Sequence, residues 1–311
     1  MSEEGGSAPK VSFAVPIRNG GQFLPRLLAS LRAQDFTDFE VVICDNDSSD
    51  ETLEIARSVA ECDARVRVFQ NDRNIGQVAN FNRVVDLARG RYLRWIGCDD
   101  WLEPSYARRC VEALDQSPEA IGVTTYQDHI DDEGTRHYAE YTGPRLQSSR
   151  PEDRFCRMMW FLNADYRYID PIYSMLRRDA VLRTRRLLLV PSMDQVLAAE
   201  LALLGPFLHI PECLAHRRLE VVQELEELQR RYHPASPEAL DPTRLLAKTV
   251  PAMWEPLSRV PMGPVPRTVC ALTLIRYGIL ASLYCLEPRL RRSARLALNR
   301  LAQPRGSTQA W

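Results

Sequence analysis

The chain has 311 residues, of which 45% are hydrophobic and 26% are charged, with 14 glycines and 21 prolines. This balance excludes a collagen-like, low-complexity or fully disordered chain, and the length suffices for one large domain or for one domain with an appendage. The formal net charge of −1 argues against a dedicated nucleic-acid-binding protein. The eight cysteines form no C-x-x-C pair, so a zinc site or disulfide scaffold is not expected and reduced thiols in the cytoplasm fit better.

The charge is unevenly distributed along the chain. Residues 1–8 lack an apolar run and are expected to be a disordered N-terminus, not a signal peptide. From Arg259 to Trp311 there are nine arginines, no lysine and one acid, Glu287, which gives a net charge of +8. Because the whole chain carries −1, the rest carries about −9. This asymmetry predicts an acidic body with a basic tail.

Strand and helix patterns alternate over residues 11–97. Short β-branched apolar runs predict buried strands, and apolar residues on one helical face predict helices. The predicted elements are a strand at 11–17, a helix at 23–34, a strand at 39–44, a helix at 51–61 with Ser49 or Asp50 as its N-cap, a strand at 65–70, a helix at 76–88 and a strand at 91–97. This order implies right-handed βαβ crossovers and a mostly parallel sheet flanked by helices.

Acidic and amide side chains follow three successive strands. They are Asp45 and Asp47, then Asn71, Asp72 and Asn74, then Asp99 and Asp100. Ligands of parallel sheets bind outside the carboxyl ends of the strands, so these side chains are expected to converge on one edge. Asp and Asn also favour turns, but turn chemistry does not require an Asp at each of three strand ends.

The chemistry of this edge favours a metal-bound nucleoside diphosphate. The sequence has neither a G-x-G-x-x-G run after the first strand nor a Walker lysine motif, so no glycine loop is expected to hold phosphates. Carboxylates repel a bare diphosphate. Mg²⁺ or Mn²⁺ held by one or two carboxylates turns this repulsion into attraction, because phosphate oxygens complete the coordination shell of the ion.

At these residues the chain resembles the family 2 inverting glycosyltransferases of the GT-A fold. VSFAVPIRNGGQFLPRLLASLRAQ is similar to the opening strand, Pro-x-x-Asn turn and first helix of that family. FEVVICDNDSSDET is similar to its Asp-Asp-Gly-Ser-x-Asp segment, and NDRNIGQVANFNRVVDLARGRYLRWIGCDDWLEP to its Asn-x-Gly helix and acidic metal motif. The likeness is strong over residues 11–104 and continues weakly to about 220. It implies an α/β fold of the GT-A type, a Rossmann-like, mostly parallel sheet flanked by helices.

The resemblance also implies roles for individual residues on the donor side. Asp45 would read the nucleotide base and Asp47 would hold its loop, while Pro16 and Asn19 would form the pocket wall. The remaining donor residues would be Asn74 and Gly76, where the backbone approaches the nucleotide, and Asp99, the ligand of Mn²⁺ or Mg²⁺, with Asp100 as its neighbour or alternative ligand.

The sequence departs from the family pattern at two positions. Gly97 stands where the usual Asp-x-Asp has its first acid, and the usual Asp-Asp-Gly-Ser loop is Asp45-Asn46-Asp47-Ser48 here. Loss of one acid is expected to leave more of the metal shell to water and phosphate. A diphosphate supplies several oxygens itself, so the site is not expected to be lost.

The second half supplies the expected acceptor side. Residues 121–134 predict a strand and an acidic turn, and residues 167–182 predict a strand that leads into a helix. In the resembling family these strands lie beneath the acceptor. The candidate acceptor contacts are Tyr126, Asp128, Asp170 and Tyr173, with structural aromatics and turn acids as the alternative.

Residues 191–205 predict an amphipathic helix with Asp194 in its first turn. Such an acid ordinarily complements the helix dipole. The resemblance instead implies that Asp194 is the catalytic base, with Asp170 as the second candidate, because inverting transfer needs a carboxylate within reach of the acceptor hydroxyl. Strands are predicted at 205–211 and 210–220, where His216 and Arg217 would contact diphosphate or metal unless they form a solvated strand end.

The tail predicts a charged surface helix at 221–233, an irregular connection at 234–266 and a largely apolar segment at 268–286, followed by a basic amphipathic one. Three interpretations of the apolar segment remain open: helices packed in the core or in a homodimer, a peripheral contact with the inner membrane face through residues 268–311, and a membrane span. Arg276 at its middle counts against the span.

The prediction is thus a GT-A domain at 9–218 and a helical region at 219–311 that is basic towards its end. The expected activity is metal-assisted, inverting sugar transfer from a UDP, dTDP or GDP sugar to a glycan, lipid-linked or small-molecule acceptor. A nucleotidyltransferase acting on sugar phosphates and a non-catalytic nucleotide-binding relative are the alternatives.

Overall fold

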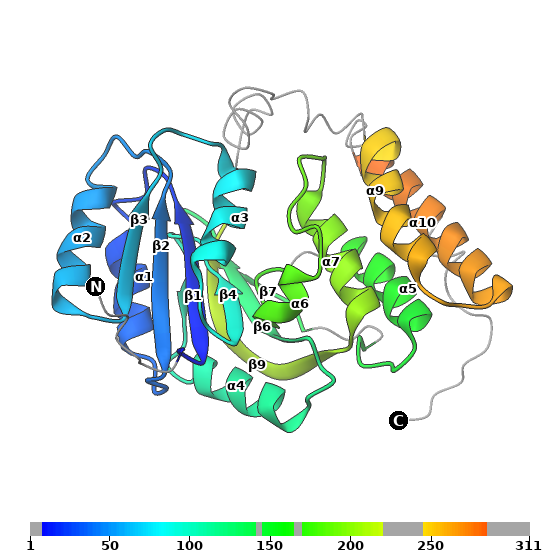
Figure 1. Ribbon diagram of the computed structural model, residues 1–311, viewed down its shortest axis with the longest axis horizontal. Coiled ribbons are helices and arrows are strands. Elements are labelled where there is room, and N and C mark those ends of the chain that lie inside the picture. The colour runs from blue at the N-terminus through cyan, green and yellow to red at the C-terminus, as the bar shows by residue number, and fades with distance from the viewer. Residues whose placement is uncertain (1–7, 141–144, 165–169, 220–244, 285–311) are drawn as a thin grey trace, which may run out of the picture.

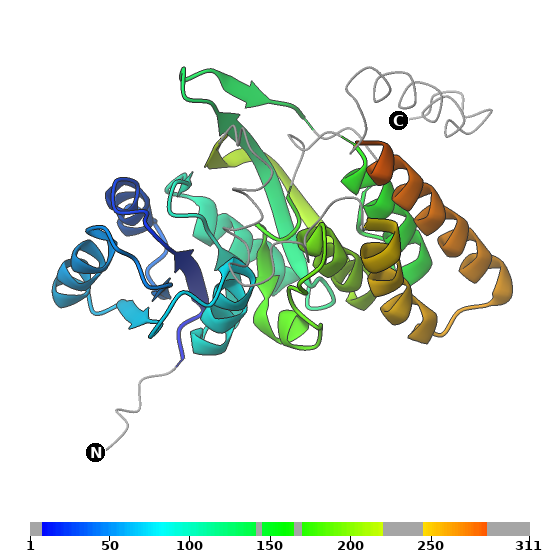
Figure 2. The ribbon, with the colours of Figure 1, turned by 90° about the horizontal axis from the view of Figure 1, so that it is seen from above.

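A computed structural model describes residues 8–140, 145–164, 170–219 and 245–284 (Figure 1). Within them, one mixed sheet runs in the order β3-β2-β1-β4-β8-β6-β9-β5, and β7 pairs with β6 outside this path. Helices cover both faces of the sheet, and a three-helix group of α5 (Pro151–Leu162), α9 (Leu245–Arg259) and α10 (Pro264–Tyr284) lies at one end of the molecule (Figures 1 and 2). The predicted α/β architecture is therefore present.

The first half is a parallel sheet built from alternating strands and helices. Its strands are β1 (Val11–Ile17), β2 (Phe39–Asp45), β3 (Val66–Gln70) and β4 (Tyr92–Trp95), and its helices are α1 (Leu24–Arg32), α2 (Thr52–Cys62) and α3 (Gln77–Leu87). Each lies within two residues of its predicted position. The predicted N-cap is corrected: Glu51 precedes α2, although Asp50 still accepts the backbone N–H of Thr52 at 3.2 Å.

Successive side chains of the strands point to opposite faces of the sheet, which divides the core into two clusters. Phe13 and Val15 of β1 pack towards α1 and α4, whereas Ala14 packs on the other face with α3, α5 and α7. Because both faces of β1 and β2 are covered, every residue of these strands is buried. The central strands therefore provide a rigid base for the loops at their carboxyl ends.

The second half inserts antiparallel strands into the sheet. Its elements are β5 (Trp101–Leu102), α4 (Tyr106–Gln116), β6 (Gly122–Ile130), β7 (Arg136–Tyr138), α5 (Pro151–Leu162), β8 (Met175–Arg177), α6 (Arg178–Leu182), α7 (Met193–Leu204) and β9 (Phe207–Arg218). β8 is antiparallel to both β4 and β6, while β9 is parallel to β6. The two strands predicted at 205–211 and 210–220 form the single strand β9, and helices α4 and α5 were not predicted.

The C-terminal part contains α9 (Leu245–Arg259) and α10 (Pro264–Tyr284). The prediction of an irregular connection at 234–266 is wrong for residues 245–259, where a helix forms despite Pro251 and Pro256. Met253 and Leu257 are fully buried on one face of α9, so tertiary packing outweighs the low helix propensity of proline.

The apolar segment predicted at 268–286 corresponds to α10, whose inner face packs against α5 and α9. The core-packed interpretation is therefore correct for that face. None of the described helices is long and apolar enough to cross a membrane. The predictions for residues 1–7, for the charged helix at 221–233 and for the basic segment from 287 lie outside the described residues. The boundary between residues 218 and 219 stays a prediction.

Candidate active site

The donor side of the site begins where β1 and β2 end next to each other. Ile17 pairs with Asp45 in the sheet, and the Asp45 side chain is fully buried. Both carboxylate oxygens of Asp45 accept hydrogen bonds from Ser48, one from the backbone N–H at 3.2 Å and one from the hydroxyl. The Ser48 hydroxyl oxygen in turn accepts the backbone N–H of Asn19 at 2.9 Å. The predicted donor residues Asp45 and Asn19 are thus joined through Ser48.

Two residues of these loops have left-handed backbones. Asn19 has a φ of 52° and Asp47 a φ of 61°, a region that Asn and Asp tolerate better than most side chains do. The Asp47 side chain is exposed, so it shapes the loop through its backbone. Pro16 is buried within β1. The loop geometry therefore depends on residue type at the two positions with positive φ.

A network of asparagine amides joins the ends of β2 and β3 to the start of α3. Asn46 donates to the side-chain oxygen of Asn74 at 2.9 Å and accepts from Asn71 at 2.8 Å. Asn71 also donates to Asn80 at 2.9 Å, and Asn74 accepts the backbone N–H of Gly76 at 2.9 Å. Asn46, which departs from the family pattern in sequence, therefore holds the predicted donor residue Asn74 directly and Gly76 through Asn74.

The acidic turn after β4 brings two carboxylates close together. Asp100 is 3% exposed and accepts the backbone N–H of Gly97 at 3.3 Å. Burial, together with the charge of Asp100, raises the pKa of Asp99 to about 6. A Cβ at Gly97 would lie 2.8 Å from Asp99 Oδ1 and 3.0 Å from Asp100 Oδ2. Glycine at 97 is therefore what allows both following acids to fold towards the same point.

A cavity of about 190 Å³ lies between the start of α3, the start of α7 and the end of β9. Its polar lining combines predicted residues with one that the sequence analysis did not single out: Asp170, Tyr173, Asp194 and Arg217, together with Gln77. Two predicted acceptor residues, the predicted base and one predicted donor residue thus meet in one space.

Arg217 connects this cavity to the acidic turn. One terminal guanidinium nitrogen donates to Asp170 at 2.7 Å, and Nε lies 3.6 Å from an Asp100 carboxylate oxygen. The guanidinium carbon lies 4.0 Å from the centroid of the Tyr173 ring. Within the described ranges, the buried Nε of Arg217 has no hydrogen-bond partner. Arg217 therefore offers an N–H donor to a ligand while it is held between two carboxylates and an aromatic ring.

Asp194 has the electrostatic setting of a general base. Burial, together with the negative charge of Asp170, raises the pKa of Asp194 to about 6. A carboxylate with this pKa is ionised at neutral pH but accepts a proton more readily than an ordinary Asp.

The first turn of α7, which carries Asp194, is held by the C-terminal helices. Tyr277 of α10 donates a hydrogen bond to the side-chain oxygen of Gln195. The hydroxyl of Thr249, on α9, donates to the carbonyl oxygen of Pro191 at 2.6 Å. Both anchoring side chains are buried. No sequence motif marks Tyr277 or Thr249, since their role depends on how α9 and α10 pack against α7.

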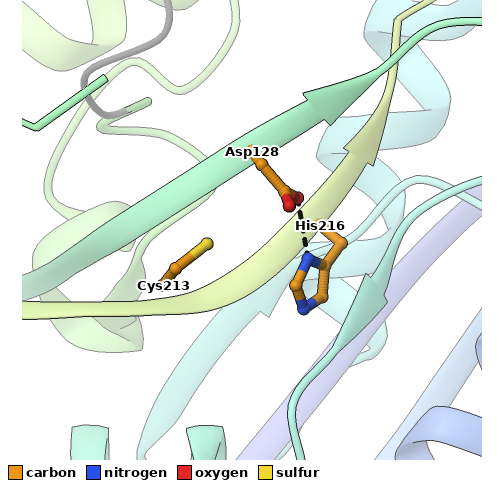
Figure 3. A group of neighbouring side chains, drawn as sticks. All are labelled: Asp128, Cys213 and His216. Carbon is orange, nitrogen blue, oxygen red and sulfur yellow. Dashed lines mark hydrogen bonds and ion pairs between the residues drawn. The ribbon is translucent and has the colours of Figure 1, made fainter. Parts of the chain in front are cut away.

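The three metal ligands predicted from the sequence, Asp99, Asp100 and His216, do not form one group in the structure. The structure groups His216 with Asp128 and Cys213 instead of with Asp99 and Asp100; the ligand atoms of these three residues lie within 4.8 Å of one another (Figure 3). His216 Nδ1 is 2.7 Å from Asp128 and Nε2 is 2.9 Å from Glu103. Burial opposes protonation of His216, but these two carboxylates outweigh it and raise the pKa of the imidazole.

Two predicted acceptor contacts also have structural partners away from the cavity. Asp128 is fully buried, and it accepts a hydrogen bond from Arg136 Nε at 2.6 Å in addition to its contact with His216. Tyr126 is 7% exposed and packs edge-to-face on Tyr138 and His209. Neither Tyr126 nor Asp128 lines the cavity. The contacts of Tyr126 and Asp128 therefore fit a role in holding the fold better than a role in binding an acceptor.

Comparison with known proteins places this geometry in a family. The family model described as "Glycosyl transferase family 2" matches residues 12–182. Chondroitin synthase of Escherichia coli is 34% identical over 137 residues, which are 44% of this chain and 20% of that protein. The succinoglycan biosynthesis protein ExoO of Rhizobium meliloti is 29% identical over 184 residues, or 56% of this chain and 52% of that protein. The chain therefore spans only a fifth to a half of these two curated relatives.

Solved structures confirm the predicted GT-A fold. S. aureus TarS 1–349 in complex with UDP-GlcNAc matches with a TM-score of 0.61 and 16% identity, over 86% of this chain and 72% of that one. The mannosyltransferase PcManGT from Pyrobaculum calidifontis, in complex with GDP-Man and Mn²⁺, matches with a TM-score of 0.52 and 16% identity, over 96% and 81%. At these identities the likeness concerns the fold alone. Since the family match spans more than half of its residues, the chain belongs to glycosyl transferase family 2.

Proposed function

We propose that this chain is an inverting glycosyltransferase that moves a sugar from a nucleoside-diphosphate sugar to an acceptor hydroxyl or amine. One observation carries the proposal. Arg217 lies between Asp100, in the acidic turn, and Asp170, in the cavity that also contains Asp194. Arg217 thus connects the acidic turn, which suits a metal-bound diphosphate, with the cavity where Asp194 could activate an acceptor. We assign the transferase domain to residues 9–218.

The donor is proposed to bind over the ends of β1 and β2. A carboxylate can accept a hydrogen bond from the ring N–H of uracil, thymine or guanine, so UDP, dTDP and GDP sugars are all candidates. Because Asp45 is fully buried and bonded to Ser48, the Ser48 loop would have to open for this contact. The amide network around Asn46 would hold the loop where the nucleotide approaches the backbone at Gly76. Solved structures of this fold that were determined with UDP-GlcNAc and with GDP-Man support a nucleotide-sugar donor.

The acidic turn suits a hard divalent cation. Asp99 and Asp100 provide only oxygen ligands. Burial and the charge of Asp100 raise the pKa of Asp99, and the positive charge of the nearby Arg217 only partly offsets them. The group of Asp128, Cys213 and His216 is less suited to Mn²⁺ or Mg²⁺, because its ligands include nitrogen and sulfur and Arg136 already neutralises Asp128. Mn²⁺ or Mg²⁺ bound by Asp99 and Asp100 would act as a Lewis acid for the departing nucleoside diphosphate.

The protein side chains perform the remaining steps in this proposal. Asp194 accepts the proton of the acceptor hydroxyl or amine as the acceptor attacks the sugar from the side opposite to the leaving diphosphate, which inverts the anomeric centre. Arg217 donates its Nε–H, which has no hydrogen-bond partner among the described residues, to the diphosphate and stabilises the negative charge that grows there. The Tyr173 ring and Asp170 keep the guanidinium in this position.

The proposal is tested first by calorimetric titration with UDP, GDP and dTDP, each with and without Mn²⁺. We expect one nucleotide to bind in a metal-dependent way and Asp99→Asn to abolish the metal dependence. Asp179→Asn, which removes an exposed acid on α6, serves as the matched control and should bind as the wild type does. Unchanged metal dependence in Asp99→Asn would contradict the assignment of the acidic turn.

Product analysis then separates the proposed reaction from its alternatives. A glycosyltransferase releases a nucleoside diphosphate from the sugar donor, and NMR of the product gives the anomeric configuration. A nucleotidyltransferase would release pyrophosphate from a nucleoside triphosphate and a sugar phosphate. A non-catalytic relative would bind the nucleotide without metal-dependent turnover of any donor.

A further inference from the structure

Helix α10 exposes a continuous apolar stripe on its outer side. The side chains of this α10 stripe are 47–72% exposed, and they are Val265, Val269, Leu272, Ile275 and Ile279. Their spacing of three or four residues places them on one helical face. α10 forms the outer edge of the three-helix group in both views (Figures 1 and 2). The α10 stripe therefore faces away from the body of the protein.

The rest of α10 is fixed in the fold, so the helix cannot rotate to bury this stripe. On the opposite face, Cys270, Leu274 and Tyr277 are at most 2% exposed. A Cβ at Gly278 would lie 2.7 Å from a methyl carbon of Val250, which shows how closely α9 and α10 cross. Scattered exposed apolar residues are normal on a protein surface, whereas a contiguous stripe marks an interaction surface.

Charge discriminates between the surfaces that could cover the stripe. The sequence from Arg259 to the end carries +8, while the rest of the chain carries −9. The only charged residues between 259 and 284, within the part of the chain that the structure describes, are Arg259, Arg267 and Arg276, so two copies of this chain joined through α10 would bring like charges together. An anionic lipid surface would attract the arginines while its apolar boundary accepts the stripe.

We propose that the α10 stripe docks this protein on an anionic membrane surface, with the helix lying in the plane of the interface. The apolar side chains would enter the boundary between headgroups and acyl chains, and the arginines of residues 259–311 would contact anionic headgroups. An apolar face and a basic segment are the two signals that stable interfacial binding requires. This inference does not depend on the sugar-transfer proposal, because no residue of the stripe lines the cavity.

Vesicle co-sedimentation of the full chain tests the inference. We expect binding to phosphatidylcholine vesicles that contain about 30% phosphatidylglycerol, little binding to pure phosphatidylcholine, and weakening at high salt. The double variant Leu272→Gln/Ile275→Gln should lose roughly tenfold in affinity, because two of the five inserted apolar side chains are removed. Leu182→Gln, which changes an exposed leucine on α6, is the matched control and should bind as the wild type does.

Three results would overturn the inference. The first is absence of binding to the anionic vesicles, and the second is equal binding by the wild type and the double variant. The third is a dimer by light scattering that the double variant converts to a monomer, since the stripe would then join two copies. Unchanged thermal unfolding and unchanged nucleotide titration of the double variant show that it is folded, which keeps this test separate from the test of sugar transfer.

Discussion

The hydroxyl of Tyr277 donates a hydrogen bond to the side chain of Gln195, the residue that directly follows Asp194. Tyr277 lies on α10, in the C-terminal region, whereas Asp194 lines the cavity next to the sheet. This contact joins the last described helix to the first turn of the helix that carries the proposed base. Thr249 makes a second contact of this kind from α9, to the carbonyl of Pro191. The C-terminal helices therefore help to position Asp194.

Replacement Tyr277→Phe should lower kcat several-fold while the donor dissociation constant stays unchanged. The ring still fills its buried position, so packing is kept, but the first turn of α7 loses its anchor and Asp194 is positioned less well. Steady-state kinetics together with nucleotide titration measure the two effects. A variant with equal losses in donor binding and in kcat would indicate a general structural defect instead of a positioning role.

The rate of sugar transfer should fall as the pH decreases through about 6. Burial and the charge of Asp170 raise the pKa of Asp194 to about 6, and a general base acts only in its deprotonated form. The rate should therefore rise with pH up to about 7 and then level off. Asp99 has a similarly raised pKa, so nucleotide binding must be measured over the same pH range. A rate that stays constant down to about pH 4.5 at saturating donor would contradict the role of Asp194.

Replacement Gly97→Ala should weaken metal-dependent nucleotide binding about tenfold. The new Cβ would lie 2.8 Å from Asp99 Oδ1 and 3.0 Å from Asp100 Oδ2, so at least one carboxylate must move away. Gly263→Ala is the control, because its Cβ would meet only Pro266, at 3.8 Å. Calorimetric titration with and without Mn²⁺ measures the effect. Tighter metal binding in Gly97→Ala would mean that the acids are not held by the space at this glycine.

The first hundred residues could be read well from sequence because their periodicity is local. Apolar runs such as 11–17 and amphipathic faces such as 24–32 determine their own structure, and the order of elements then determines the parallel pairing. For the same reason, the side chains that follow β2 and β3 could be predicted to lie close together, as the hydrogen bonds of Asn46 with Asn71 and Asn74 show. Helix α4 was missed although Tyr106 and Cys110 lie on one buried face, because its many charged residues resemble a surface loop.

Side-chain partnerships across distant segments could not be predicted in this way. His216 follows a strand pattern similar to the family, but whether it faces Asp99 or Asp128 depends on the irregular register between β6 and β9 near Tyr126. In the sequence, Asn46 is only a departure from the family pattern. Its role in the amide network follows from hydrogen bonds with Asn71 and Asn74, which lie next to it in space. These relationships depend on three-dimensional packing, which the pattern of a single sequence does not reveal.

Replacement Asp194→Asn should abolish transfer and stabilise the protein at neutral pH. A pKa raised from 3.8 to about 6 means that folding disfavours the ionised carboxylate. In the wild type, the stability that comes with a neutral Asp194 carboxyl group is fully present below about pH 4 and is lost as the pH rises through about 6. The amide in Asp194→Asn stays neutral at every pH, so the free energy of unfolding of this variant should exceed that of the wild type by about 1–2 kcal/mol at pH 7. Thermal unfolding from about pH 4 to 8 measures this, with Asp179→Asn as the exposed control. An Asp194→Asn protein that is less stable than wild type at every pH would show that the ionised carboxylate is well compensated in the fold.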